Sequence, residues 1–150
     1  MFGRVITAMA TPFGEDGSLD LERARDLAAW LVANGSDGLV VCGSTGESPT
    51  LNVEEKRALI TAVVDAVGSR ADVIAGTGTY STRESIELSQ MAAECGVGGL
   101  LVVTPYYSRP PQSGLVAHFS AIAGSVKLPI ILYDIPIRTC LLYTSPSPRD

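Results

Sequence analysis

The stretch "DGLVVCGSTGESPTLNVEEKRALITAVVDAVG", residues 37–68, combines a short apolar run, a polar turn and an amphipathic run. Residues 37–43 are apolar between two glycines, as expected of a parallel strand that is covered on both faces. Residues 52–68 have helical periodicity, with Asn52 as the candidate N-cap, acidic side chains in the first turn and Gly68 at the end. The stretch therefore predicts one strand–turn–helix unit.

Similar units recur along the whole chain. Strands are predicted at residues 4–9, 37–43, 72–78, 98–105 and 128–134, and helices at residues 19–35, 52–68, 81–96 and 112–126. The strand centres lie about 30 residues apart, a spacing that is typical of a (β/α)8 barrel. A doubly wound dinucleotide-binding sheet is the rival, but no glycine fingerprint follows the first strand. We expect an α/β fold, namely a (β/α)8 TIM barrel truncated after about its fifth strand.

Local signals place the helix ends. In the first helix Leu21, Leu27, Trp30 and Leu31 are expected to share one buried stripe, and Gly35 to end the helix. Residues 81–84, "STRE", fit a capping box at the start of the third helix. Residues 1–139 are expected to form the N-terminal part of a single barrel domain. Residues 140–150, "CLLYTSPSPRD", lack periodicity and are interpreted as a non-native tail.

Composition excludes several classes of function. The 150 residues carry a formal net charge of −5 and no basic run, which argues against a nucleic-acid surface. No apolar run is long enough to span a membrane, and no secretory signal is visible. The three cysteines lie far apart and form neither a metal-ligand pair nor a disulfide framework. A soluble, cytoplasmic protein is the expectation.

Hydroxyl groups and glycines follow the predicted strands, where a barrel places its active site. Because no metal-like carboxylate cluster joins them, no metal or cofactor is expected. The one histidine, His118, falls within a predicted helix and is interpreted as a helix-face residue, so a Ser-His-Asp triad is not expected.

Ser44 and Thr45 stand side by side between Gly43 and Gly46. Their two hydroxyls and the neighbouring N–H groups suit a carboxylate. A phosphate-binding P-loop is excluded because the turn has no lysine. A purely structural turn remains an equal alternative on this pattern alone.

Tyr107, Tyr133 and Arg138 follow the fourth and fifth predicted strands. A phenol in a dry site can relay protons, and a guanidinium can hold a carboxylate through two hydrogen bonds. The alternatives are amphipathic tyrosines that cover the core and a solvated loop charge.

Three segments, "GSTGES", "TPYYSRPPQSGLVAHF" and "ILYDIPIRT", closely resemble the dihydrodipicolinate synthases, which are pyruvate-dependent lyases of the class I aldolase type. The resemblance covers about residues 2–139. It implies a barrel that condenses pyruvate with aspartate semialdehyde on the route to lysine and diaminopimelate, through a Schiff base on a strand-six lysine. It also implies a cytoplasmic dimer of dimers.

The resemblance also implies roles for single residues. Thr45 matches the binder of the pyruvate carboxylate, and Tyr133 matches the proton donor and acceptor at the Schiff-base carbon. Ser44 stands where the synthases usually have threonine and keeps the hydroxyl of the proton relay. Tyr107 matches a relay tyrosine that reaches the neighbouring subunit's site, and Arg138 matches the guard that binds the aldehyde substrate's carboxylate.

Two departures from the family pattern carry expectations. The only lysines are Lys56 and Lys127, expected on the outer helix ring and at the bottom of the barrel, so the chain as written should not form the imine. Lysine-inhibited members use polar residues that Ser48, Glu84 and Tyr106 match. Val53, Lys56 and Tyr80 stand where histidines and an asparagine often stand in those members, so weak or absent lysine feedback is expected. Ser48, Tyr80, Glu84 and Tyr106 are therefore predicted as a weak regulatory site.

Three alternatives remain open. N-acetylneuraminate lyase shares the turn motif, and Ser44 alone favours it, whereas Arg138 and the "YYSRPPQ" loop favour the synthases. Other pyruvate-utilising aldolases are also compatible with the sequence. A truncated half-barrel that catalyses nothing is the alternative of another class.

Overall fold

The computed structural model describes residues 2–139 and contains five parallel strands. Each strand pairs with the next along the chain, so the sheet order follows the sequence. This finding confirms the predicted α/β half-barrel, while the expectation for residues 140–150 lies outside the described residues. The strands are β1 (Ile6–Ala8), β2 (Gly38–Val41), β3 (Asp72–Gly76), β4 (Gly99–Val103) and β5 (Ile130–Tyr133).

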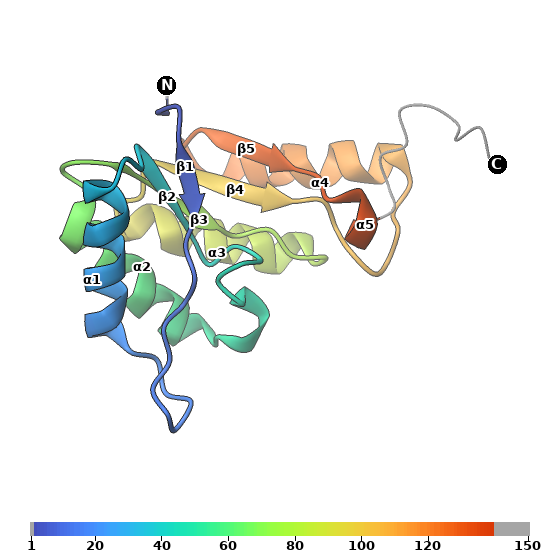
Figure 1. The fold of residues 1–150 in the computed structure, drawn as a ribbon. Helices are drawn as coiled ribbons and strands as arrows, with labels where there is room; N and C mark the ends of the chain where they lie inside the picture. The colour runs from blue at the N-terminus through green and yellow to red at the C-terminus, as the bar shows by residue number, and fades with distance from the viewer. Residues whose placement is uncertain (1, 140–150) are drawn as a thin grey trace, which may run out of the picture.

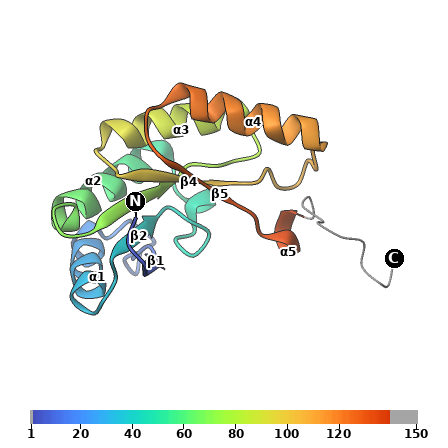
Figure 2. The ribbon, with the colours of Figure 1, turned by 90° about the horizontal axis from the view of Figure 1, so that it is seen from above.

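Four long helices connect the strands and lie along one side of the sheet (Figures 1 and 2). This arrangement is the one that successive right-handed β–α–β crossovers produce. Within residues 2–139 no helix is long and apolar enough to cross a membrane. The helices are α1 (Leu21–Ala33), α2 (Val53–Val67), α3 (Thr82–Glu94) and α4 (Gln112–Ser125), with a 3-10 helix η1 (Ser48–Thr50) and a short α5 (Pro136–Thr139).

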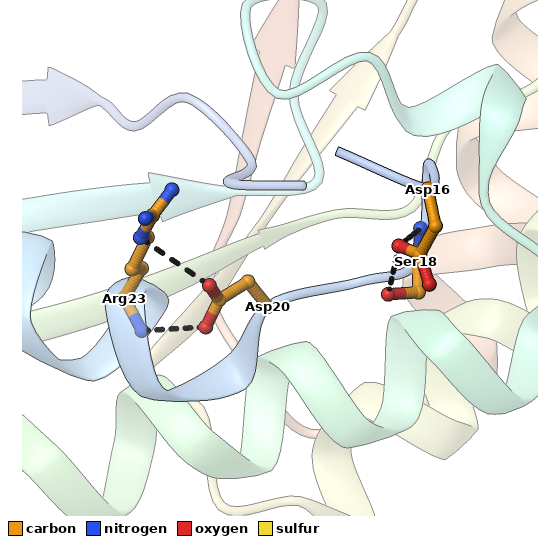
Figure 3. A network of polar contacts seen from close by, with 4 residues as sticks. All are labelled: Asp16, Ser18, Asp20 and Arg23. Atoms are coloured by element: carbon orange, nitrogen blue, oxygen red, sulfur yellow. Dashed lines mark hydrogen bonds and ion pairs between the residues drawn. The ribbon is translucent and has the colours of Figure 1, made fainter. Parts of the chain in front are cut away.

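Side chains in the loop before α1 set where that helix begins (Figure 3). The carboxylate of Asp20 accepts a hydrogen bond from the backbone N–H of Arg23 at 2.9 Å and forms an ion pair with the Arg23 guanidinium at 3.4 Å. Asp16 accepts two bonds from Ser18, from the backbone N–H at 3.0 Å and from the hydroxyl at 2.7 Å. The bond to Asp20 satisfies one of the first N–H groups of α1, which have no partner within the helix.

Gly35 ends α1 as predicted. It adopts φ +102°, and the N–H groups of Gly35 and Ser36 donate to the carbonyls of Val32 and Leu31 at 3.3 and 3.1 Å, the pattern of a Schellman motif. The prediction for Trp30 is wrong, because its side chain is 61% exposed. Ala24 and Ala28 are fully buried on the inner face of α1 instead. Their small side chains allow α1 to pack closely against its neighbours, chiefly α2.

The caps of α2 and α3 differ from each other. Asn52 is the N-cap of α2, as predicted, and together with Glu55 it forms a complete capping box. The capping box predicted for α3 is only half formed. Ser81 accepts from the Glu84 N–H, but the Ser81 N–H donates to the hydroxyl of Thr79 at 3.0 Å.

The core lies between the sheet and the helices. Alternate strand residues face the helices and are fully or almost fully buried, each buried Leu or Val contributing about 1.5–3 kcal/mol. The opposite face of β4 carries Leu101 and Val103, which are only half-buried. The residues on the helix side are Leu39, Val41, Val73, Ala75, Leu100 and Val102.

Candidate active site

A cavity of about 850 Å³ lies where β2, β3, β4 and β5 end. Leu101 and Val103 of β4 and Tyr133 of β5 line it from the sheet. Loop residues after each of these strands complete the lining. This is the end of a parallel sheet at which barrel proteins bind their ligands.

The turn after β2 is held by its own backbone. The N–H groups of Gly46 and Ser48 both donate to the carbonyl of Gly43, at 3.1 and 3.4 Å. Cys42 and Glu47, on either side of this turn, have φ values of +57° and +52°, a region that residues with a side chain rarely adopt. The turn is therefore a strained one, and strain of this kind is concentrated at functional sites.

Two glycines bring neighbouring strands' ends close together. A Cβ atom at Gly76 would lie 2.3 Å from the carbonyl oxygen of Cys42, and one at Gly78 would lie 2.3 Å from the nitrogen of Val103. Only glycine fits such approaches to backbone atoms. The loop after β3 consequently lies against both the β2 turn and β4, which closes one wall of the cavity.

The structure brings most of the predicted site residues into this one cavity. Ser44, Tyr107, Tyr133 and Arg138 all contribute to its lining. Thr45, on the same turn, is not part of the lining, although Ser44 and Thr45 are both exposed to solvent. The four predicted regulatory residues also line the cavity, so the two predicted sites form one continuous hollow. These residues are Ser48, Tyr80, Glu84 and Tyr106.

Tyr133 and Arg138 are presented by the end of β5 and by α5. The backbone carbonyl of Tyr133 accepts bonds from the N–H and the hydroxyl of Thr104 at 2.8 and 3.1 Å, which fixes the end of β5 against β4. The hydroxyl of Thr139 donates to the Asp134 carboxylate at 2.9 Å. This bond closes the turn that carries Arg138.

Tyr107 is the most exposed aromatic residue at the cavity, with 93% of its surface accessible and φ +69°. Its neighbour Tyr106 is half-buried and meets Tyr80 edge to face, with 5.5 Å between ring centroids. Burial, together with the nearby Glu84 carboxylate and Tyr80, raises the pKa of the Tyr106 phenol. The phenol therefore stays protonated and is a hydrogen-bond donor at neutral pH.

Cys42 lines the cavity but carries no thiolate chemistry. Burial raises its pKa to about 12, although the nearby Lys56 ammonium acts in the opposite direction. A thiol with such a pKa is protonated at neutral pH and is a poor nucleophile.

Lys56 contradicts the expectation that it lies on the outer ring. It is in the first turns of α2, as predicted, but it is 9% exposed and lines the cavity. Its ammonium donates to the carbonyl of Leu51 at 2.8 Å. The spacing from Lys56 to Leu59, Ile60 and Val63 follows the buried stripe of α2, so helical periodicity in the sequence already contained this signal.

His118 lies on α4 and does not line the cavity. It is 5% exposed and hydrogen-bonds through Nδ1 to the hydroxyl of Thr82 on α3, at 2.8 Å. Burial lowers its pKa. Within residues 2–139 no group of three or more histidine, cysteine, aspartate or glutamate side chains is arranged to hold a metal ion.

Comparisons with known proteins agree on one family. The family model described as "Dihydrodipicolinate synthetase family" matches residues 1–144. A 4-hydroxy-tetrahydrodipicolinate synthase of Moorella thermoacetica is 64% identical over 138 residues, which cover 92% of this chain and 47% of the relative. The chain thus spans about half the length of the curated relatives it matches.

Solved structures show the same similarity. The crystal structure of a dihydrodipicolinate synthase from Bacillus anthracis superimposes with a TM-score of 0.92 at 47% identity, covering 94% of this chain and 48% of that one. The chloride-inhibited dihydrodipicolinate synthase from Acinetobacter baumannii, solved in complex with pyruvate, has a TM-score of 0.89 at 42% identity, covering 91% of this chain and 47% of that one.

Proposed function

The chain belongs to the dihydrodipicolinate synthetase family, and on that premise we propose that it supplies the N-terminal half of a 4-hydroxy-tetrahydrodipicolinate synthase. Residues 1–139 are its contribution to a single barrel domain, and residues 140–150 are a non-native tail. The reaction is the Schiff-base condensation of pyruvate with L-aspartate 4-semialdehyde, in the biosynthesis of lysine and diaminopimelate. The protein works in the cytoplasm.

One observation carries the proposal: Ser44, Tyr107, Tyr133 and Arg138 line the same cavity at the carboxyl ends of parallel strands. These residues come from three separate strand ends and the segments that follow them. Their convergence supports a common substrate, because a purely structural turn after β2 would not require the segments after β4 and β5 to present phenol and guanidinium groups beside it.

The hydroxyl groups are proposed to move protons. Forming and breaking an imine requires a proton at each step, and a positioned acid or base contributes typically 10²–10⁴-fold. Tyr133 serves at the reacting carbon, and Ser44 connects it to the Tyr107 of a neighbouring copy of the protein. Thr45 lies on the same turn as Ser44 but outside the cavity lining. It is proposed to bind the pyruvate carboxylate through its hydroxyl and the adjacent backbone N–H groups.

Arg138 is proposed to select the second substrate. Its guanidinium can hold a carboxylate through two parallel hydrogen bonds. Aspartate semialdehyde carries such a carboxylate, and this requirement favours the synthase reaction over that of N-acetylneuraminate lyase. Comparing turnover of the two substrates distinguishes the two reactions.

Tyr107 is proposed to act in a neighbouring copy of the protein. A tyrosine with 93% of its surface exposed at a cavity rim has room to enter another subunit's site, and a dimer of dimers is the expected assembly. Ser48, Tyr80, Glu84 and Tyr106 make up a weak regulatory site beside the substrate. Lysine titration of the active enzyme checks this assignment, and inhibition at sub-millimolar lysine contradicts it.

The imine-forming lysine is proposed to lie outside this chain. Lys56 lines the cavity but uses its ammonium to hold the Leu51 carbonyl. The chain alone is therefore a non-catalytic half-barrel. The test treats two proteins with pyruvate and borohydride, followed by mass spectrometry. They are this chain, and a chimaera in which residues 1–139 precede the C-terminal part of the Moorella thermoacetica relative. We expect a covalent adduct only in the chimaera, and an adduct on Lys56 would overturn the assignment.

A further inference from the structure

We infer that Lys56 is a positioning residue: its ammonium fixes the far end of the turn that carries Ser44, and so holds that hydroxyl in the cavity. The inference rests on the proposed function for its catalytic consequence. The structural part concerns the β2–α2 loop alone and is testable without any substrate.

Lys56 is the one basic residue among residues 2–139 whose side chain forms a buried hydrogen bond to a backbone carbonyl. It is 9% exposed, and its Nζ donates to the Leu51 carbonyl at 2.8 Å. The two ion pairs within residues 2–139 involve Arg23 and Arg57, not Lys56. A buried ammonium is costly to desolvate, so its retention on an otherwise apolar helix stripe calls for a specific partner, and the Leu51 carbonyl is that partner.

Leu51 needs a donor from outside the helix. It directly precedes Asn52, the N-cap of α2, so its carbonyl lies outside the helical hydrogen-bond ladder. It is 4% exposed and its backbone is extended, with φ −95° and ψ 136°. A buried carbonyl without a donor is destabilising, and Lys56 supplies the donor from one turn further along α2.

The loop between Gly43 and Leu51 is thereby anchored at two points. In its first half, the Thr11 hydroxyl donates to the Gly46 carbonyl at 2.6 Å. At its end, the Leu51 N–H donates to Ser48 at 3.2 Å and its carbonyl accepts from Lys56. Between the anchors lies Glu47, in a strained φ region, which only a well-constrained loop retains. Releasing the Lys56 anchor would free the strained segment, and Ser44 with it, because the Glu47 N–H donates to the Ser44 carbonyl at 3.3 Å.

If Lys56 only stabilises the fold, its loss should accelerate amide exchange throughout the chain. If it positions the β2–α2 loop, its loss should accelerate exchange mainly in that loop. Hydrogen exchange of the 150-residue chain separates the two. We expect Lys56→Met to accelerate exchange of the amides of Gly46, Glu47 and Ser48 about tenfold. Amides of α1 should change less than these. Lys56→Arg, which retains a cationic donor, should restore most of the protection.

Arg57→Met is the matched control. Arg57 is the next residue on α2, is exposed, and pairs with Glu94 at 3.0 Å. Its loss removes one positive charge from the same helix turn without touching the Leu51 carbonyl. Exchange in the β2–α2 loop should stay at the level of the unsubstituted chain.

The inference is overturned if loop amides exchange no faster in Lys56→Met than in Arg57→Met. It is also overturned if Lys56→Met and the milder Lys56→Gln both accelerate exchange equally throughout the chain. In the chimaera, Lys56→Met should lower kcat for the condensation about tenfold with a smaller change in the KM for pyruvate. A chimaera without activity would contradict the proposed function and leave the exchange result standing.

Discussion

The hydroxyl of Thr11 donates a 2.6 Å hydrogen bond to the backbone carbonyl of Gly46, and thereby ties the loop after β1 to the turn after β2. Thr11 is 7% exposed, so neither group has ready access to water. Gly46 allows this contact because a Cβ atom there would lie only 3.1 Å from the Met9 carbonyl and 3.2 Å from the Thr11 hydroxyl. The turn that presents Ser44 therefore depends on a residue from the loop after another strand.

Thr11→Val should destabilise the protein and loosen this turn. Leaving the buried Gly46 carbonyl without its donor is expected to cost about 1–3 kcal/mol in the free energy of unfolding, measured by urea denaturation. Thr7→Val is the control, because the Thr7 hydroxyl bonds to Ser36, which precedes β2, and is only half-buried. An equal loss in both variants would contradict a special role for the Thr11 bond.

Gly76→Ala should be among the more damaging single-methyl changes in the protein. The added Cβ would meet the Cys42 carbonyl at 2.3 Å, and the backbone shift needed is expected to lower the free energy of unfolding by about 1–3 kcal/mol. Gly124→Ala makes the same chemical change on α4 with no atom within 4 Å. It should stabilise the helix by about 0.5–1 kcal/mol. Thermal unfolding of the two variants gives the comparison, and a tolerated Gly76→Ala would refute the close approach.

Cys42 should resist alkylation in the folded protein. Burial raises its pKa to about 12, so at pH 8 almost no thiolate is present to react. Cys95 is only half-buried and should be labelled first of the two. Peptide mapping after iodoacetamide treatment, with and without denaturant, measures both sites. Rapid labelling of Cys42 in the folded protein would contradict the buried, protonated state of this thiol.

His118 should make stability depend on pH. Its pKa is lowered by burial, and its Nε2 has no hydrogen-bond partner among the described residues. The unfolded chain therefore binds a proton more readily than the folded one. The free energy of unfolding is then fully present above the ordinary histidine pKa of about 6.5 and falls as the pH decreases below it.

Urea denaturation between about pH 5.5 and 7.5 measures this effect, since most carboxylates remain ionised over that range. His118 is the one histidine in the sequence, so His118→Gln should remove most of the slope. A slope that survives this substitution would assign the pH dependence to another group.

Tyr133→Phe should lower kcat of the chimaera by about 10²–10⁴-fold, because it removes the proposed proton donor while keeping the ring. Trp30→Phe, on the exposed face of α1, is the control for a change of aromatic side chain far from the cavity. Steady-state assays with pyruvate and aspartate semialdehyde test both variants. An unchanged kcat in Tyr133→Phe would exclude that role.

Local signals in the sequence predicted the order of strands and helices correctly. Asn52 caps α2 and Gly35 ends α1, because caps depend on backbone groups only three or four residues away. The sequence also predicted where the cavity lies. Polar residues follow the predicted strands, and all parallel strands end at the same edge of the sheet.

What the tertiary structure alone decided are the contacts between segments distant in the sequence. Trp30 lies on the outside because Ala24 and Ala28 take the inner face of α1, and of the two neighbouring hydroxyl residues only Ser44, not Thr45, lines the cavity. The direction of a side chain on a turn depends on how other loops pack against that turn. The sequence itself therefore determined which segments form strands, helices and a polar rim. The packing of those segments decided which hydroxyls share a cavity.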